Sequence, residues 1–350
     1  MTLVTKIGYS PLSGDFSQPG DYRRFAGYAK YRGIPIEIAK VDEKYDLVVL
    51  SQGADISTWC DYSKGRIVYD FVDSYLSIPY SDIKGCLRGT AKFATRQHAR
   101  LQFNYWETIR NMCRRSDAVV CTAETQRSQI LPYCDNTHIV LDMHDSLKAV
   151  VKSDYKATAP YKLVWEGLPG NISQLAVIRD VLCHLNEHYQ VELHLVTDLV
   201  GYRWLNKFWE ESSTEAAKKI FNRVTVHKWA KETCARIVSQ CDVAVIPIDL
   251  SDPMVTGKPE NKLLLLWRMG MPVVTSATPA YVRTMEEAGL SLSCKKSSEW
   301  VSQIEKLLLN EESRRDTGRK GLDYVTKYHS KDKLIEKWDH IFQSVGFDFT

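Results

Sequence analysis

Two lysines flank the expected start of a helix in the C-terminal half of the chain. Lys258 precedes Pro259 and Glu260, Lys262 follows them, and apolar residues over 261–269 predict a helix. A proline at an early position with a glutamate nearby is typical of a helix N-terminus. The free N–H groups and the dipole of such a terminus favour an anion, and the lysines add positive charge. The sequence therefore predicts a diphosphate site here.

The neighbours of these lysines each allow two interpretations. Thr256 and Gly257 would let the backbone approach a phosphate closely, or they form a plain loop. Glu260 and Asn261 either contact the ligand or only cap the helix. Lys262 is otherwise a solvated helix residue, but two lysines at one helix start favour phosphate binding.

Two more groups of candidates follow expected strands in the same half. The first is a turn after residues 161–165, which is either a simple tight turn or a ligand contact, and it contains Gly167, Pro169, Gly170 and Asn171. The second is His227 and Trp229, expected just past a strand, which are packing residues or contact a nucleobase. Because ligands gather at the carboxyl ends of parallel strands, both groups are candidates for a binding site.

Carboxylates in the N-terminal half are candidates for proton transfer. Asp70 and Asp73 lie at the end of a strand expected at 66–71, and Tyr75 follows them. A carboxylate in this place can accept the proton of an attacking hydroxyl. The alternative for Asp73 is a helix N-cap.

Four basic residues recur at intervals of four in a stretch that predicts one long helix, residues 87–115. This spacing aligns them along one helix face, and they are Arg88, Lys92, Arg96 and Arg100. Such a stripe is either a solvated surface or a contact for anionic lipid headgroups or acceptor phosphates, although we expect no dense exposed apolar strip beside it. On the core face of the same helix we expect Leu101, Tyr105, Ile109 and Met112. Further along the chain, a crevice-lining role or a capping role is open for Asp142, His144 and Asp145.

Short apolar strands alternate with amphipathic helices along the whole chain. Strands are expected at 3–9, 45–51, 66–71, 118–122 and 138–141, then at 161–165, 191–197, 223–227, 243–248 and 272–276. Helices are expected at 21–32, 87–115, 173–188, 231–240, 261–269, 298–309 and 331–345. A polar stretch at 152–160 ends in proline and reads as a linker. The pattern predicts an α/β protein of two Rossmann-like doubly wound domains facing across a cleft, with sites at the carboxyl ends of the strands.

Composition is consistent with a folded protein of two domains. The chain has 350 residues, 44% hydrophobic and 25% charged, and its net charge of +3 does not suit a protein that wraps nucleic acid. The nine cysteines show no metal-binding spacing, and the start of the chain does not look like a signal peptide. We therefore expect reduced thiols, no metal and a cytoplasmic location.

Residues 258–276, KPENKLLLLWRMGMPVVTS, resemble the donor-binding signature of GT-B glycosyltransferases, especially the large retaining group. Three other segments resemble that group in the same order, SDAVVCTAETQRSQI, YKLVWEGLPGN and VTVHKWAKETCARIVSQCDVAVIPI. The resemblance implies an N-terminal acceptor domain at 1–155 and a nucleotide-sugar donor domain at 156–325. It also implies a C-terminal helix at 326–350 that packs back across the domains.

For function, the resemblance implies a glycosyltransferase that moves a sugar from a nucleotide-sugar to a hydroxyl of a glycan or a lipid-linked acceptor. The nucleotide-sugar is a co-substrate, no cofactor is expected, and the protein would contact the inner membrane surface peripherally. Asp73, with Asp70, is the catalytic candidate. The small-residue loop with Ser13 and Gly14 is placed on the acceptor side, as are Tyr75 and Arg96.

The sequence departs from the family at a pair of glutamates spaced by seven residues. Their positions are occupied by Gly257 and Leu265, so Glu260, Asn261 or Asp252 takes over their contacts, or the donor is unusual. This departure leaves three alternatives open: another kind of donor, a nucleotide-sugar epimerase, and a catalytically silent protein that binds a glycan or partner. Other chemistries have no motif, since GxGxxG after a strand, GxxxxGK[ST] and GxSxG are all absent.

Overall fold

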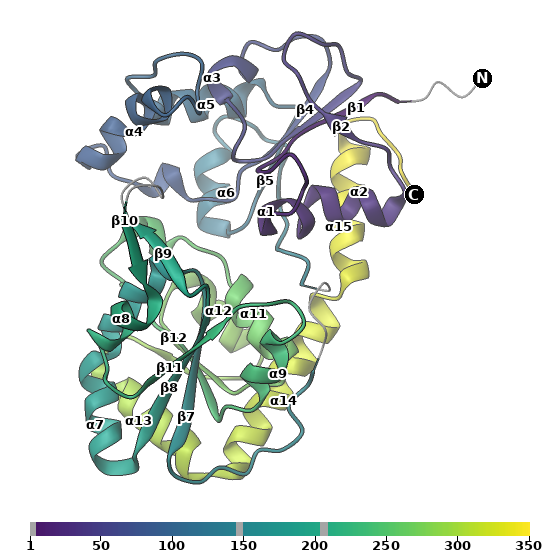
Figure 1. The fold of residues 1–350 in the computed structure, drawn as a ribbon. Helices are drawn as coiled ribbons and strands as arrows, with labels where there is room; N and C mark the ends of the chain where they lie inside the picture. Colours follow the sequence, from purple (N-terminus) through teal and green to yellow (C-terminus); the bar gives the residue numbers. More distant parts are fainter. Residues whose placement is uncertain (1–4, 145–149, 204–208) are drawn as a thin grey trace. The chain divides into compact units, whose positions relative to one another are not determined.

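The computed structural model describes residues 5–144, 150–203 and 209–350, and these form two compact units (Figure 1). The N-terminal unit comprises Met1–Met143, Gly257–Pro259 and Lys331–Thr350. The C-terminal unit comprises His144–Thr256 and Glu260–Ser330. Asp145 lies outside the described residues.

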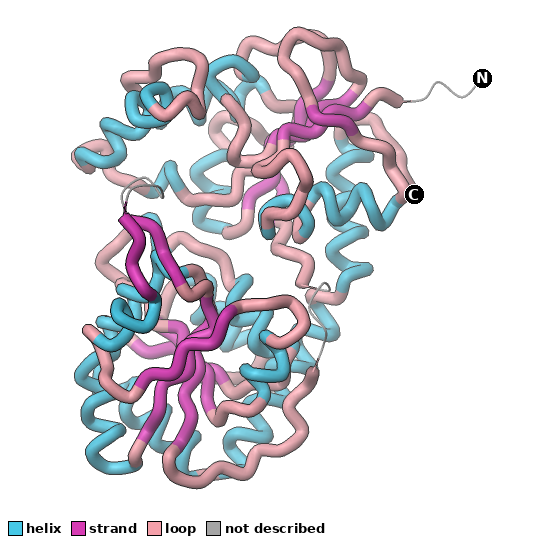
Figure 2. The backbone as a smooth tube through the Cα atoms, viewed as in Figure 1, coloured by secondary structure: helices cyan, strands magenta, loops and turns pink. Residues whose placement is uncertain are grey.

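The N-terminal unit is built on a parallel sheet with the strand order β2-β1-β3-β4-β5-β6 (Figure 2). Its strands are β1 Ile7–Ser10, β2 Glu37–Ile38, β3 Leu47–Leu50, β4 Arg66–Asp70, β5 Ala118–Cys121 and β6 Thr137–Ile139. Its helices are α1 Pro19–Tyr22, α2 Phe25–Arg32, α3 Ile56–Trp59, the 3-10 helix η1 Tyr75–Ser77, α4 Ile83–Ala94, α5 Tyr105–Arg115, α6 Glu124–Ile130 and α15 Lys331–Ser344. The four residues of β3 and of β5 are all buried, as the apolar runs in the sequence predict.

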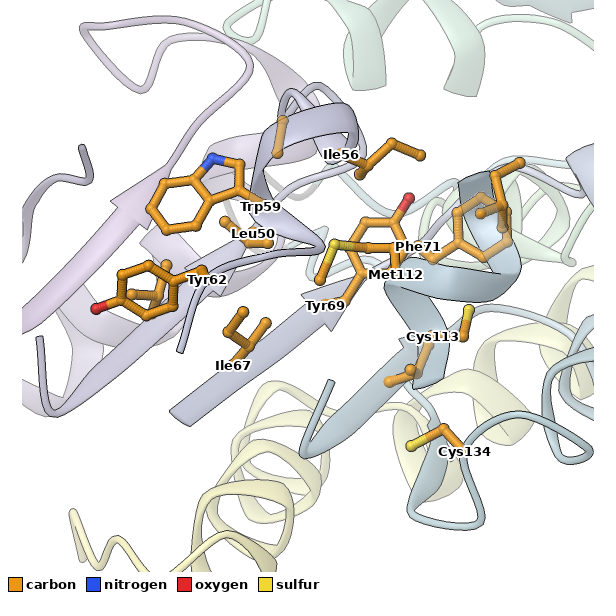
Figure 3. Close-up of a cluster of buried hydrophobic side chains, with 14 of the residues drawn as sticks. Leu50, Ile56, Trp59, Tyr62, Ile67, Tyr69, Phe71, Met112, Cys113 and Cys134 are labelled. Carbon is orange, nitrogen blue, oxygen red and sulfur yellow. The ribbon is translucent and has the colours of Figure 1, made fainter. Parts of the chain in front are cut away.

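A large apolar cluster fills the space between the central strands and α5 (Figure 3). Ile109 and Met112 of α5 are fully buried against Tyr69 and Phe71, whose rings stack at 5.4 Å. Tyr105 is buried in the same cluster, so the predicted core face is confirmed for these three residues of α5. Leu101 is 40% exposed and precedes the helix, so its assignment to that face is wrong.

The single long helix predicted at 87–115 is wrong. The chain leaves the helical path after α4, where Arg96 has a positive φ of 58°, and α5 begins only after Asn104 accepts a hydrogen bond from Glu107 N. A left-handed residue ends a helix, and an Asn cap starts a new one. Arg96 and Arg100 therefore lie outside any helix, and the predicted four-residue stripe does not exist.

Helix α15 packs on α2 within the N-terminal unit. Trp338 and Phe342 are fully buried, and the Phe342 ring stacks on Tyr28 at 5.2 Å between ring centroids. The Tyr28 hydroxyl also donates to Asp339 Oδ1 at 2.8 Å. The last segment of the chain is therefore an integral part of the N-terminal core.

The C-terminal unit contains a second parallel sheet with the order β11-β8-β7-β12-β13-β14 (Figure 2). Its strands are β7 Tyr161–Glu166, β8 Val191–Thr197, β11 Val224–Lys228, β12 Val243–Ile246, β13 Val273–Ser276 and β14 Ser293–Cys294, and the hairpin β9 Val200–Arg203 with β10 Trp209–Ser212 stands apart. Its helices are the 3-10 helix η2 Pro169–Ile178, α7 Arg179–Tyr189, α8 Ser213–Lys218, α9 Cys234–Ser239, α10 Pro253–Thr256, α11 Asn261–Arg268, α12 Pro279–Glu287, α13 Ser297–Leu309 and α14 Glu311–Tyr328.

Three features of this unit differ from the sequence prediction. The helix expected at 173–188 divides into η2 and α7, and the helix expected at 231–240 is only the short α9. The long α14 carries many charged residues and was not predicted. Its Gly321 lies so close to Trp267 of α11 that an added Cβ would collide with the indole ring, so a glycine is required for this packing.

Candidate functional site

The strand order of each sheet determines where a ligand fits. In the C-terminal unit the strand order runs outward from β7, first through β8 to β11 and then, on the other side, from β12 to β14, so the order of strand addition reverses between the parallel strands β7 and β12. In the N-terminal unit the corresponding point lies between β1 and β3. Crevices at the carboxyl ends of the strands on either side of such a point are the usual ligand sites of doubly wound sheets.

Lys262 lies at this point of the C-terminal unit. Its ammonium is 4.8 Å from the ring centroid of Trp165, near the carboxyl end of β7. Gly167, just past the strand, leaves room for it, because an added Cβ would lie 2.7 Å from Lys262 Nζ and 2.8 Å from the Trp165 ring. The structure thus brings Lys262 and Gly167, two predicted site residues, into contact. Trp165 was not predicted as part of the site.

Helix α11 begins beside this lysine, as predicted. Asn261 is its first residue, and Glu260 occupies the N-cap position without accepting a capping hydrogen bond through its side chain. Glu260 is 4% exposed, forms an ion pair with Arg283 of α12, and has one carboxylate oxygen, Oε2, without a hydrogen-bond partner. Burial raises the pKa of this carboxyl group, and Arg283 acts against that rise.

The loop before α11 is held by its own side chains. Asp252 Oδ1 accepts from Met254 N at 2.9 Å and Val255 N at 3.3 Å, so this carboxylate caps α10. The Thr256 hydroxyl donates to Asp252 O at 2.7 Å. Asp252 therefore has a local structural role.

Gly257 and Lys258 group with the N-terminal unit. Ser74 Oγ donates to Gly257 O at 2.9 Å, and an added Cβ at Gly257 would lie 3.0 Å from that hydroxyl. The structure consequently places the two lysines of the predicted phosphate site in different units, Lys258 with the first and Lys262 with the second.

The turn after β7 leads directly into η2. Asn171 N donates to Leu168 O at 2.9 Å, and an added Cβ at Gly170 would meet nothing within 4 Å. The turn lies at the carboxyl end of the central strand, where the sequence places it.

His227 does not follow a strand, as the sequence suggested, but lies within β11. Its Nε2 is 2.9 Å from Nδ1 of His194 on β8, and the two rings stack with centroids 5.2 Å apart. Trp229 follows the strand and donates its backbone N–H to Thr197 O at 2.9 Å. The His227 ring is thus hydrogen-bonded to the His194 ring, whereas Trp229 lies just past the end of β11.

This histidine pair predicts a pH dependence of stability. Burial lowers the pKa of both His194 and His227, and each also lies close to the other. The unfolded chain binds protons more readily than the folded chain. The pair should therefore not reduce stability above pH 6.5, the ordinary pKa of histidine, and the free energy of unfolding should fall as the pH drops below that value. Urea unfolding at pH 7.5 and 5.5 measures this loss. The loss should shrink in a His194→Gln/His227→Gln variant, and an unchanged loss would contradict the assignment.

In the N-terminal unit, the loop after β1 is tied down by a buried carboxylate. Asp21 accepts hydrogen bonds from Leu12 N at 2.8 Å, from Ser13 N at 3.1 Å and from the Tyr9 hydroxyl at 2.8 Å. The Ser13 hydroxyl is also directed to Asp21, at 3.2 Å. Gly14 remains exposed at the tip of the loop. Asp21 was not predicted, because nothing local distinguishes it from a surface residue.

Asp70 ends β4 and is buried in an ion pair. Both of its oxygens lie 2.6 Å from the guanidinium of Arg24, which also donates to Val140 O and Asp142. Asp70 and Arg24 are each 1% exposed. The contact explains the conformation of Asp70 without a role in chemistry, and it gives Asp142 a structural partner too.

Asp73 lies in a segment fixed by Gln52, just past β3, and by Gln126 of α6. Its N–H donates to Gln52 Oε1 at 3.1 Å, and its carbonyl accepts from Gln126 Nε2 at 3.2 Å. Gln126 also donates to Phe71 O at 2.6 Å. The N-cap of η1 is Ser74, so Asp73 is not the cap that the sequence left open as an alternative. The glutamines carry no motif that would have singled them out.

Comparisons with known proteins agree with this architecture. Residues 168–310 match the family model of glycosyl transferases group 1. The matched residues lie within the C-terminal unit, apart from Gly257–Pro259. The predicted family resemblance is thereby confirmed. No curated protein matches the chain in sequence.

Solved structures show the same fold at low sequence identity. HepE from Anabaena, in complex with UDP and glucose, has a TM-score of 0.63 and 12% identity over 97% of this chain and 100% of its own. Sucrose-phosphate synthase from Thermosynechococcus elongatus has a TM-score of 0.61 and 13% identity over 94% of this chain and 78% of its own. A TarM structure from S. aureus has a TM-score of 0.56 and 12% identity over 84% of this chain and 55% of its own, so the chain spans about half the length of TarM. The predicted GT-B fold is confirmed.

Proposed function

We propose that this protein transfers a sugar from a nucleoside-diphosphate sugar to a hydroxyl group of a glycan or glycolipid. The observation that carries the proposal is the position of Lys262, whose ammonium lies beside Gly167 at the point where the C-terminal sheet reverses its strand order. Similar structures have been determined with UDP, UDP-glucose, or UDP and α-GlcNAc-glycerol. A nucleoside diphosphate is accordingly the leaving group that we propose.

Lys262 and the start of α11 would stabilise the leaving diphosphate. When the glycosidic bond to the nucleotide breaks, negative charge builds up on the diphosphate oxygens. A lysine and the free N–H groups of a helix start, already in place, lower the energy of that charge. Trp165 limits the positions that the Lys262 side chain can take, so little reorganisation accompanies the step.

Asp73 is our candidate on the acceptor side. It follows the carboxyl end of β4, and the side chains of Gln52 and of Gln126 on α6 hold its backbone. In this role it would orient the acceptor hydroxyl or accept its proton.

The acceptor that we propose is lipid-linked, with the N-terminal unit in peripheral contact with a cytoplasmic membrane surface. The support comes from α4 and its flanking loops, where large apolar side chains are exposed. Ile83 is 73%, Leu87 58% and Phe103 79% exposed. The prediction from the sequence that no exposed apolar strip lies beside the basic residues was therefore wrong. No helix in the described ranges is long and apolar enough to span a bilayer.

A nucleotide panel tests the function. One of UDP, GDP or CMP should raise the midpoint temperature of thermal unfolding. A nucleotide at 100 times its Kd adds about 2.7 kcal/mol to the free energy of unfolding. The matching nucleotide-sugars should then be consumed in the presence of a suitable acceptor. Absence of any nucleotide response, together with stabilisation by an oligosaccharide, would instead establish the silent glycan-binding alternative. That alternative draws on the replacement of a family glutamate by the buried Leu265.

A further inference from the structure

The first half of the predicted basic stripe turns inward onto two tyrosines. Arg88 and Lys92 lie one turn apart on α4. The guanidinium of Arg88 is 4.4 Å from the centroid of the Tyr75 ring, and Lys92 Nζ is 5.7 Å from that of Tyr105. The two tyrosine rings meet edge to face at 6.1 Å. The four side chains therefore form one compact cluster.

His98 completes the cluster. Its ring lies 5.7 Å from that of Tyr105, and its side chain belongs to a residue only 2% exposed. Neither ring nitrogen has a hydrogen-bond partner. Burial lowers the pKa of His98 to about 4, with Lys92 contributing, so the ring is neutral at pH 7 and retains one donor N–H.

The two cations of the cluster form no direct ion pair. Among the described residues, neither Arg88 nor Lys92 forms an ion pair, and Arg88 Nε is buried without a hydrogen-bond partner. Lys92 makes a long hydrogen bond of 3.4 Å to the neutral Gln97. The nearby Asp55 is occupied by Ser57 and by Ala99 N. Burial, followed by the charge of Arg88, lowers the pKa of Lys92, and the charges of Asp55 and Asp73 offset this fall only in part.

We propose that Arg88, Lys92 and His98 bind a phosphate group of the acceptor substrate. This inference rests on the proposed function and names the chemical class of its acceptor. A phosphate carries the negative charge that relieves the repulsion between two cations and provides the acceptor oxygens that their unused donors need. Arg88 and Lys92 are partly shielded from water and His98 is buried, which strengthens such charge-assisted bonds.

The position of the cluster agrees with an acceptor role. Tyr75 is two residues beyond Asp73, and Asp73 together with Arg88 influences the pKa of the Tyr75 hydroxyl, which burial raises. A phosphate held here would consequently lie near the proposed acceptor-side carboxylate.

The apolar residues of α4 indicate what the phosphate is attached to. Ile83 and Leu87 are one turn apart, and Leu87 directly precedes Arg88, so an exposed apolar ridge runs beside the cationic one. Such a pair of ridges fits an amphipathic phosphate with a hydrocarbon chain. A free phosphate ion would use the cationic ridge alone.

Binding of dodecyl phosphate, inorganic phosphate and dodecanol to the full chain tests the proposal. Kd values are measured by calorimetry below the critical micelle concentration. We expect dodecyl phosphate to bind, and an Arg88→Gln/Lys92→Gln variant to bind it at least 10-fold more weakly. An Ile83→Ser/Leu87→Ser variant should bind dodecyl phosphate more weakly than the natural chain and bind inorganic phosphate with unchanged affinity. Equal affinity for both phosphates would support the anion site and show that the hydrocarbon contributes nothing.

The matched control is Arg110→Gln/Arg114→Gln on α5. These arginines have the same four-residue spacing and also lie over a tyrosine, Tyr133, but both pair with Glu107. The control removes the same charge and should bind dodecyl phosphate as the natural chain does. Equal affinities of the two double variants, or tight binding of dodecanol alone, would overturn the proposal.

Two further measurements separate this proposal from the others. The nucleotide response should persist in the Arg88→Gln/Lys92→Gln variant, so loss of phosphate binding with retained nucleotide binding assigns the effect to the cluster. A chain that binds dodecyl phosphate but no nucleotide would refute the donor proposal and leave the anion site standing. If the double variant does not fold, Lys92→Met keeps the apolar stem of the side chain and should still raise the Kd for dodecyl phosphate several-fold. An unchanged Kd in that variant would overturn the proposal.

Discussion

Replacing Lys262 with alanine should abolish the thermal stabilisation of the protein by its nucleoside diphosphate and lower kcat/KM by about 10²–10³-fold. The ammonium lies at the carboxyl end of β7, next to the start of α11, and it would contact the diphosphate in both the bound donor and the leaving group. A hydrogen bond to a charged group contributes about 1.5–3 kcal/mol, which corresponds to a rise in Kd of about 10- to 150-fold. Calorimetry with the nucleotide and initial rates with its sugar conjugate measure the two effects.

Two further variants make this test specific. Lys162→Ala removes the same charge near the amino end of β7, where the side chain is exposed, and should leave nucleotide binding unchanged. Gly167→Ala retains Lys262 but places a methyl group 2.7 Å from its ammonium. The methyl group should displace the ammonium and so weaken nucleotide binding. If Lys262→Ala and Lys162→Ala responded alike to the nucleotide, Lys262 would have no role in donor binding.

Asp70→Asn and Asp73→Asn should have opposite consequences although the chemical change is the same. Asp70 neutralises the buried Arg24, so its loss leaves a buried charge incompletely paired and should lower the free energy of unfolding by about 3–5 kcal/mol. Asp73 is partly exposed and held through its backbone, so Asp73→Asn should retain stability and nucleotide binding but lower kcat by about 10²–10⁴-fold. Urea unfolding and initial rates separate the two results.

The buried pair also provides an internal control. An Arg24→Met/Asp70→Leu double variant removes both charges, and it should recover much of the stability lost in Asp70→Asn because no buried charge is left unpaired. A double variant as unstable as the single one would show that Asp70 acts through packing instead. A stable Asp70→Asn chain with reduced turnover would return Asp70 to the list of catalytic candidates.

Sequence alone was sufficient for the α/β class, the division into two parallel sheets, the GT-B resemblance and the start of α11. These features depend on local patterns: apolar runs such as 47–50 and 243–246 can be buried only in a covered parallel sheet, and the Lys-Pro-Glu-Asn run begins a helix whatever surrounds it. The same periodicity failed at 87–115, because a single left-handed residue at Arg96 ends a helix without altering the apolar spacing.

Tertiary structure alone decided which of the charged candidates are available for chemistry. Asp70 and Asp73 are both carboxylates near the end of β4, yet one is buried against an arginine 46 residues away in sequence and the other is not. Likewise, Arg88 and Lys92 are separated from Arg96 by where the helix ends, and Lys262 is brought to Gly167 across nearly a hundred residues. The energy of a charged group depends on the partners and the burial that folding gives it, and these long-range contacts leave no periodic signal in the sequence.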